Sequence, residues 1–134
     1  MDFDHRRVAL ILARARAVNG LVLLVLPGLV GRVLFGRAGA QPTTRALLRI
    51  VGVRDLVLGV GAITTLKEGT MDAEWVGMGA VADAVDGVVS LVTPGLLLRS
   101  RVVSFAGGGA AAIGLLAARA LADERVRADS EIDT

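Results

Sequence analysis

The sequence predicts an all-α fold, specifically a four-helix transmembrane bundle, and three observations lead to this prediction. Hydrophobic residues make up 54% of the 134 residues and charged residues 21%, whereas a soluble domain has about 45–50% and about 25%. The charged residues are clustered along the sequence, which is typical of apolar membrane spans that alternate with solvent-exposed loops. Glycine and charged residues share helix faces that valine avoids, as expected when lipid surrounds a small-residue interior. The uncharged runs are 17–31, 56–66, 75–82, 87–98 and 102–118.

Composition also excludes several kinds of site. The chain has no cysteine and no tyrosine, and its only histidine is His5, so disulfides, thiolate metal sites and most general bases are excluded. We therefore expect neither a metal nor a cofactor. The formal net charge is +2, and no run of basic residues is interleaved with aromatic ones, so nucleic acid is not an expected partner.

The first span is predicted over residues 8–30. Its uncharged part ends at Pro27-Gly28, and proline kinks or ends a helix because it lacks an N–H and its ring meets the preceding turn. Residues 29–35 are expected to continue as a short interfacial segment. Residues 36–44 are predicted to be a loop because they are rich in glycine, proline and threonine.

Two further spans are bounded by charged or helix-breaking residues. The second covers about 46–66 and stops at residues 67–69, where Lys-Glu-Gly follows the apolar run. The third covers about 73–93 and stops at Pro94-Gly95, which cannot continue a helix.

The fourth span covers about 101–118 and completes the bundle. Residues 1–121 are expected to form one membrane domain, and residues 122–134 a charged C-terminal tail that is either a fraying solvated helix or irregular. The assignment has a rival, because a spanning helix is best marked by about 18 or more uncharged residues. The longest such run here, 102–118, has 17. A soluble, very apolar helical bundle therefore remains an alternative.

Small residues align along one face of each predicted span. In lipid, small residues let backbones approach and gain dispersion contact, since apolar burial does not drive association there. The fourth span has more small residues than one partner helix requires, so we expect a homo-oligomer through this helix. Trp75 is expected to be an interfacial anchor at the start of the third span, with simple packing as the alternative. The helix-packing candidates are Gly52, Gly59, Gly79, Gly87, Gly107, Ala111 and Gly114.

Charged and polar side chains within the spans form the candidate functional site. Each charge would cost about 2.5–3.5 kcal/mol at a helix centre before a partner is found, so a network across helices is expected. Arg54 and Asp55 project about 100° apart, and no simple pair between them is predicted. The candidates are Arg16, Asn19, Arg49, Arg54, Asp55, Asp83 and Asp86. The expected contacts are Arg54 or Arg49 with Asp83 or Asp86, and Asp55 with Arg16 and Asn19.

Such a network has more than one use. It can be a structural clasp that fixes helix register, or it can bind a polar group. We therefore expect a non-enzymatic accessory protein or a module that interacts with a lipid or small molecule. The alternative is a membrane-embedded enzyme or a proton-coupled carrier, in which Asp83, Asp86 or Asp55 is the acid or base and Arg54 holds an anionic group.

One motif carries a family resemblance. The stretch Arg49-x-x-Gly52-x-Arg54-Asp55-x-x-x-Gly59, with Pro27, Arg32 and Phe35-Gly36 before it and Asp83 after it, resembles small bacterial and fungal four-helix membrane proteins of unknown function. These are loosely similar to the DoxX-like proteins. The resemblance covers about residues 16–94 and implies a four-helix membrane architecture. It implies no activity, cofactor or catalytic residue.

The expected location is the cell membrane, with several passes and both termini in the cytoplasm. Orientation follows the excess of Lys and Arg on the cytoplasmic side. The side of the termini carries Arg6, Arg7, Arg14, Lys67, Arg119, Arg125 and Arg127. The opposite side carries Arg32, Arg37, Arg45, Arg99 and Arg101.

Overall fold

The computed structural model describes residues 4–69, 72–94 and 98–132, and within the last range the side chains of 109–130. These residues form helices and contain no strand, so the predicted all-α class is confirmed. They include five α-helices rather than four, because α2 is a separate helix. The elements are α1 (His5–Val25), α2 (Pro27–Phe35), a 3₁₀ helix η1 (Ala38–Ala40), α3 (Pro42–Glu68), α4 (Asp72–Val92) and α5 (Leu98–Ile132).

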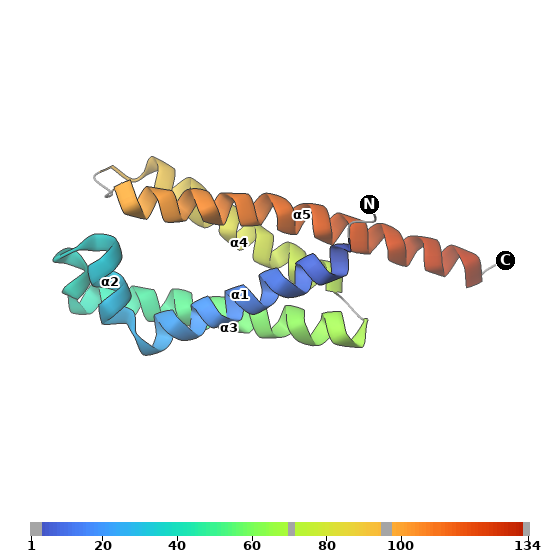
Figure 1. The fold of residues 1–134 in the computed structure, drawn as a ribbon, viewed down its shortest axis with the longest axis horizontal. Coiled ribbons are helices and arrows are strands. Elements are labelled where there is room, and N and C mark those ends of the chain that lie inside the picture. Colours follow the sequence, from blue (N-terminus) through green and yellow to red (C-terminus); the bar gives the residue numbers. More distant parts are fainter. Residues whose placement is uncertain (1–3, 70–71, 95–97, 133–134) are drawn as a thin grey trace.

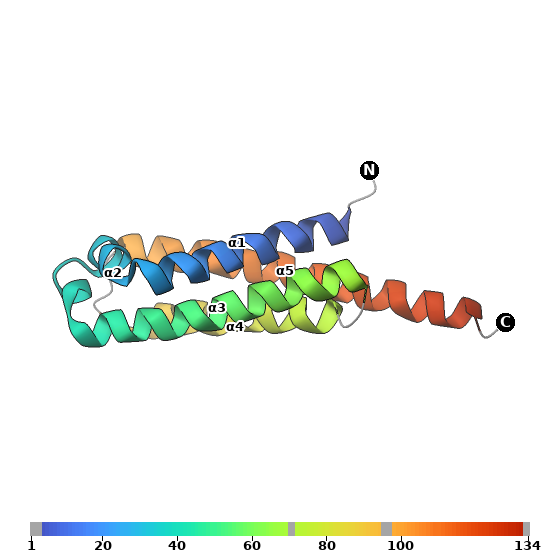
Figure 2. The same cartoon turned by 90° about the horizontal axis from the view of Figure 1, so that it is seen from below.

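The four long helices run up and down in alternation, with the short α2 folded over one end (Figures 1 and 2). The most extensive contacts join α1 to α3 and α4 to α5. We call these the α1–α3 pair and the α4–α5 pair. Smaller contacts, of α3 with α4 and of α1 with α5, form the seam between the pairs. Both termini lie at the same end, where the last part of α5 projects beyond the other helices (Figure 2).

Proline and glycine set the helix ends. The predicted span over 8–30 is divided because Pro27, at the first position of α2, has no N–H to continue α1. Gly36 ends α2 at a φ of 62° and Gly69 ends α3 at a φ of 72°, a backbone conformation that favours glycine. The Gly69 N–H donates to the Thr65 carbonyl and so closes the last turn of α3.

Two helices extend beyond the apolar spans predicted for them. Helix α3 begins at Pro42 instead of residue 46, because proline suits the first turn of a helix, where an N–H has no partner. Helix α5 continues past the apolar span at residue 118 to Ile132, so the charged segment after it is helical and continuous with it. The continuation contains alanine, arginine and glutamate and no glycine or proline, a composition that favours a helix even where it is charged.

The α1–α3 pair packs backbone against backbone. A Cβ placed on Gly59 would lie 2.6 Å from the Ala17 nitrogen, and one on Gly52 would lie 2.8 Å from the Gly20 carbonyl oxygen. A Cβ on Gly20 would overlap the backbone of Leu56. Gly52 and Gly59 therefore lie at this contact, on the α3 face that their spacing predicts.

Small residues fill the interior and bulky aliphatic residues cover the outside. The buried hydrophobic core is mostly alanine, and no large side chain in the described part is less than 2% exposed. Many Val, Leu and Ile side chains are instead more than one-third exposed, for example Val57, Val85 and Leu116. By length and composition, α1 and α4 are each able to cross a membrane. The core cluster is Ala9, Ala13, Ala62, Leu66, Val76, Ala117, Ala118 and Leu121.

Candidate functional site

Arg16 joins three helices at the centre of the bundle. Its Nη2 donates to the Asp83 carboxylate and, at 2.9 Å, to the Gly79 carbonyl oxygen, both on α4. Its Nη1 lies 3.6 Å from Asp55 Oδ1 on α3. The Arg16 side chain is only 14% exposed and that of Asp55 only 8%, so their attraction is little screened by solvent.

Arg54 extends this network from α3 toward the outer part of the seam. Its Nη2 donates to Asp55 Oδ1 at 2.9 Å and to Asp86 Oδ2 at 2.5 Å, and its Nη1 donates to Asp86 Oδ1 at 3.0 Å. Asn19 on α1 donates from Nδ2 to Asp55 Oδ2 at 3.0 Å. The central network, as we call it, is Asp83, Arg16, Asp55, Arg54, Asp86 and Asn19.

The central network contains three carboxylates and two guanidinium groups, which gives it a formal charge of −1. Its arginines cannot readily lose their protons. In a low-dielectric interior an unbalanced charge is costly unless a counter-charge or a proton compensates it. The charges of the central network therefore do not cancel, unlike those of a structural clasp with equal numbers of carboxylates and guanidinium groups.

The predicted contacts are met in part. Asp55 meets Arg16 and Asn19, and Arg54 meets Asp86, as predicted. The prediction that Arg54 and Asp55 do not pair was wrong. The reason is the length of the arginine side chain, which brings its guanidinium between Asp55 and Asp86 although the two Cβ atoms diverge.

The other network predictions also need correction. Asp83 pairs with Arg16 on α1 rather than with an arginine of α3. Arg49 is exposed, and the described residues give it no ion pair, so it lies outside the central network. Arg49 lies five residues before Arg54, so it projects about 140° away from Arg54 around α3.

Glycine at position 79 makes room for Arg16. A Cβ on Gly79 would lie 3.1 Å from Arg16 Nε and 3.3 Å from its Cζ, so the guanidinium rests directly on the α4 backbone. The other small-residue candidates on α4 and α5 differ in their surroundings. Gly87 is half-buried, and Ala111 and Gly114 are buried against the chain's own helices. Gly107 lies outside the residues whose side chains are described.

A pocket of about 410 Å³ opens in the seam beside the central network. All four long helices contribute to its wall. Its polar lining residues are Arg16, Asn19, Asp55 and Asp83. Its other lining residues are Ala9, Leu12, Ala13, Ala15, Leu58, Ala62, Trp75, Val76, Gly79, Ala80, Ala110 and Gly114.

The pocket is polar at one end and apolar at the other. The α1 residues run from Ala9 at the apolar end to Arg16 and Asn19 at the polar end, a distance of about 10–15 Å at the helical rise. Helix α4, which runs in the same direction as α1, shows the same order, from Trp75 at the apolar end to Asp83 at the polar end. This shape fits an elongated molecule with one polar group, such as an amphipathic compound.

Trp75 is part of the pocket wall. A Cβ on Gly61 would overlap the Trp75 ring, which packs partly buried against the core cluster. The contacts of Trp75 are therefore those of a packed side chain, which was the alternative to the predicted interfacial anchor. The anchor role at a membrane interface stays a prediction, as does an oligomer formed through α5.

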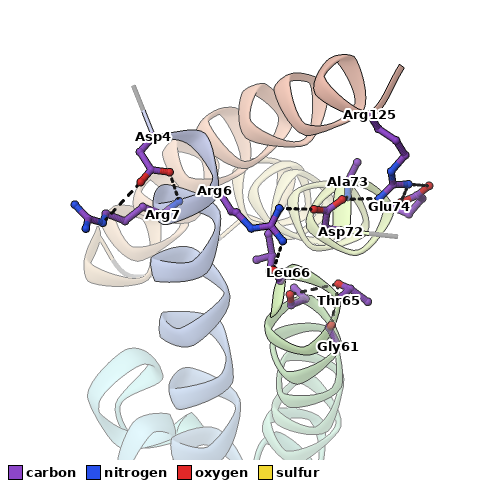
Figure 3. Close-up of polar contacts among 11 residues, drawn as sticks. Asp4, Arg6, Arg7, Gly61, Thr65, Leu66, Asp72, Ala73, Glu74 and Arg125 are labelled. Atoms are coloured by element: carbon purple, nitrogen blue, oxygen red, sulfur yellow. Dashed lines mark hydrogen bonds and ion pairs between the residues drawn. The ribbon is translucent and has the colours of Figure 1, made fainter. Parts of the chain in front are cut away.

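A second group of charges ties the helices together at the end where the termini lie (Figure 3). Asp72, at the start of α4 and 6% exposed at its side chain, pairs with Arg6 of α1 at 3.4 Å and with Arg125 of α5 at 2.6 Å. Arg6 also donates to the Leu66 carbonyl of α3, and Arg125 pairs with Glu74. We call these residues the terminal clamp.

Sequence reasoning missed the terminal clamp. Its members are 66 and 53 residues apart, so no local spacing marks them. One signal was available, because Asp72 and Glu74 lie in the first turn of α4. Acidic residues are stabilised there by the helix dipole, and arginines from neighbouring helices can reach them.

Within the described ranges, no three side chains of His, Cys, Asp or Glu are grouped so as to hold a metal ion. No protein-family model, curated protein or solved structure matches this chain. The resemblance to DoxX-like proteins therefore stays a prediction, and the function has to be inferred from the site.

Proposed function

We propose that this chain is a multi-pass membrane protein without enzymatic activity, which binds a small amphipathic molecule in the pocket between its two helix pairs. The polar group of the ligand would meet Arg16, Asn19, Asp55 and Asp83, and its apolar part would extend toward Trp75. The observation that carries the proposal is the pocket itself, which joins a polar end to an apolar end inside the bundle.

The distribution of residue types supports the membrane location. Valine and leucine side chains are exposed on the outside, while alanine, glycine and ion pairs occupy the inside. In water this arrangement would leave large apolar surfaces exposed, which monomeric soluble proteins avoid. In lipid it is favourable, because small residues let helices approach closely and charges find partners away from hydrocarbon.

Two features support ligand binding over a purely structural clasp. The central network is unbalanced by one negative charge, whereas a clasp would be stronger if balanced. In addition, Arg16 Nη1 is buried without a hydrogen-bond partner among the described residues, although it lies near Asp55. A donor that borders a pocket in this state can be satisfied by a bound polar group.

The membrane location is tested by fractionation. The full chain is expressed, membranes are washed with sodium carbonate at high pH, and the pellet and supernatant are compared. An integral protein stays in the pellet. Release into the supernatant would contradict the proposal and favour the soluble bundle.

Ligand binding is tested by filling the pocket. Ala110 lines the pocket, and Ala112 is exposed on the same helix, so Ala110→Phe and Ala112→Phe form a matched pair. Native mass spectrometry of protein purified in mild detergent should show a small co-purifying molecule on the wild type and on Ala112→Phe, and its loss from Ala110→Phe. Equal occupancy of both variants would refute binding in this pocket.

A proton-coupled carrier is the second candidate, and the excess negative charge of the central network favours it. A proton shared among Asp55, Asp83 and Asp86 would neutralise that charge during passage through the bilayer centre. In vesicles that hold the protein and a pH-sensitive dye, a carrier should acidify the lumen when a proton gradient is applied with its substrate. Asp83→Asn should abolish that flux but keep the fold. A pure binding module gives no flux in either protein.

A further inference from the structure

Arginine is concentrated without any acidic residue at the end of the bundle opposite the termini. From residue 5 to residue 54 the sequence contains no Asp or Glu. The part of this stretch that folds over the end of the bundle, from α2 to the first turns of α3, contains Arg32, Arg37, Arg45 and Arg49. We call these four residues the arginine end.

Close packing holds the arginine end together. Gly31 of α2 and Gly39 of η1 touch so closely that a Cβ on either would overlap the other's backbone. The Thr44 hydroxyl at the start of α3 donates to the Ala38 carbonyl at 3.0 Å. The three elements therefore form one small unit at the α2 end of the bundle (Figure 1), and their arginines extend from a common base.

The arginine end has no internal counter-charge. Among the described residues, no ion pair reaches any of its four members. Arg32, Arg37 and Arg49 are exposed, whereas Arg45 is half-buried beside Gly28. The Nε of Arg45 is buried and has no hydrogen-bond partner among these residues. A buried donor in this state is costly unless an acceptor from outside the chain reaches it.

The contrast with the terminal clamp is direct. There Arg6 and Arg125 share the buried carboxylate of Asp72, and Arg125 also meets Glu74. Among the described residues, acidic side chains pair with the arginines at one end and with none of the four at the other. The arginine end therefore has room for an anion from outside the chain.

We propose that the arginine end binds the phosphate of an anionic phospholipid headgroup. The proposal rests on the membrane location proposed above, because α1 and α4 both end at the level of α2 (Figure 1), where a bilayer that surrounds them would place its phosphates. Guanidinium groups bind phosphate oxygens through paired, charge-assisted hydrogen bonds. Arg45, held at the base of the unit, would donate to the phosphate, and the exposed arginines would surround it.

The test compares lipids of equal chain length. The purified full chain in mild detergent is titrated with dioctanoyl phosphatidylglycerol or dioctanoyl phosphatidylcholine, and bound lipid is counted by native mass spectrometry. The anionic lipid should bind at least about tenfold more tightly. Each of Arg32→Gln, Arg37→Gln and Arg45→Gln should weaken it about fivefold, the factor expected for one cationic side chain at an anionic membrane surface.

Arg127→Gln is the matched control, since it removes the same charge from the exposed part of α5. It should leave the affinity unchanged. The two exposed positions, 32 and 37, keep the test informative if Arg45→Gln does not fold. Equal affinity for both lipids, or equal losses in the control, would overturn the proposal.

Inorganic phosphate distinguishes a lipid from a free anion. Millimolar phosphate should not displace the anionic lipid, because the lipid is also held by its chains. Displacement would show a site for a soluble anion and would overturn the lipid proposal. A protein that stays in carbonate-washed membranes but shows no headgroup preference refutes this inference alone, whereas a protein released by the wash refutes the membrane location on which it rests.

Discussion

Different residue types make the contact inside the α1–α3 pair and the seam between the two pairs. In the α1–α3 pair, Gly20, Gly52 and Gly59 bring the two backbones together, and no Cβ fits at these positions without a shift. In the seam, by contrast, ion pairs cross a pocket of about 410 Å³. The close packing of the α1–α3 contact leaves no space for a ligand. The seam, with its ion pairs and its cavity, can bind and release one.

This comparison suggests that the α1–α3 pair is the fixed part of the protein and the seam is the adaptable part. A gap of about 0.5–1 Å between the backbones would already lose a quarter to a half of the dispersion energy of the α1–α3 contact. Long arginine side chains can follow a small movement of α4 and keep their partners. Four experiments test the difference, from the largest expected effect to the smallest.

The largest effect is expected at Gly20. Gly20→Leu would place a branched side chain against the α3 backbone at Leu56, and backbone atoms cannot rotate away as a side chain can. We expect loss of monodisperse protein in size-exclusion chromatography. A normal elution profile with an unchanged melting temperature would show that the α1–α3 pair is not the fixed part.

Arg16→Gln is expected to have the next largest effect. It leaves Asp55 and Asp83 without their shared cation in the seam. Removing one partner of a buried ion pair costs about 3–5 kcal/mol. The free energy of unfolding, measured by denaturant titration in detergent micelles, should fall by about this amount. A loss below about 1 kcal/mol would mean that the seam does not depend on Arg16.

The pair of Arg54 and Asp86 should contribute less, because the two side chains are 34% and 48% exposed. A double-mutant cycle with Arg54→Gln and Asp86→Asn should give a coupling energy of about 1 kcal/mol. Because Arg54 also meets Asp55, the arginine variant alone should lose more than the aspartate variant alone. Additive losses would show that the pair carries no coupling.

Gly109→Ala is expected to have the smallest effect and serves as the control for Gly20→Leu. Nothing lies within 4 Å of a Cβ at Gly109, and alanine favours a helix over glycine by about 1 kcal/mol. The melting temperature should stay unchanged or rise slightly. A fall of several degrees would indicate a partner against this part of α5, such as a second copy.

Local signals predicted much of this fold. Uncharged runs located the long helices, and the spacing of Gly52, Asp55 and Gly59 predicted the buried face of α3. Pro27 predicted the break after α1, although not that α2 would be a helix of its own. The change from apolar to charged residues after residue 118 predicts the end of the membrane span and the start of a fraying solvated helix or tail. The structure shows one continuous helix α5, because helix propensity continues through that change.

The partners of the charges were predicted less well. Local spacing predicts which face a side chain occupies but not the rotation and offset of neighbouring helices, which decide between Asp83 and Asp86 as a partner. Local spacing also does not predict how far a long arginine side chain reaches. Arg54 therefore pairs with its neighbour Asp55, although the two residues point in different directions. The terminal clamp and the pocket depend on residues distant in the sequence and became visible only in the folded chain.

The central claim is that aliphatic side chains on the outside of the bundle face lipid. The chain has no cysteine, so single cysteines at Val57, Val85 and Ala128 can each carry a nitroxide label in reconstituted vesicles. Electron paramagnetic resonance should show the labels at 57 and 85 relaxed by oxygen but not by a water-soluble nickel chelate, and the label at 128, on the projecting part of α5, relaxed by the chelate. Equal access of the chelate to all three would contradict the account.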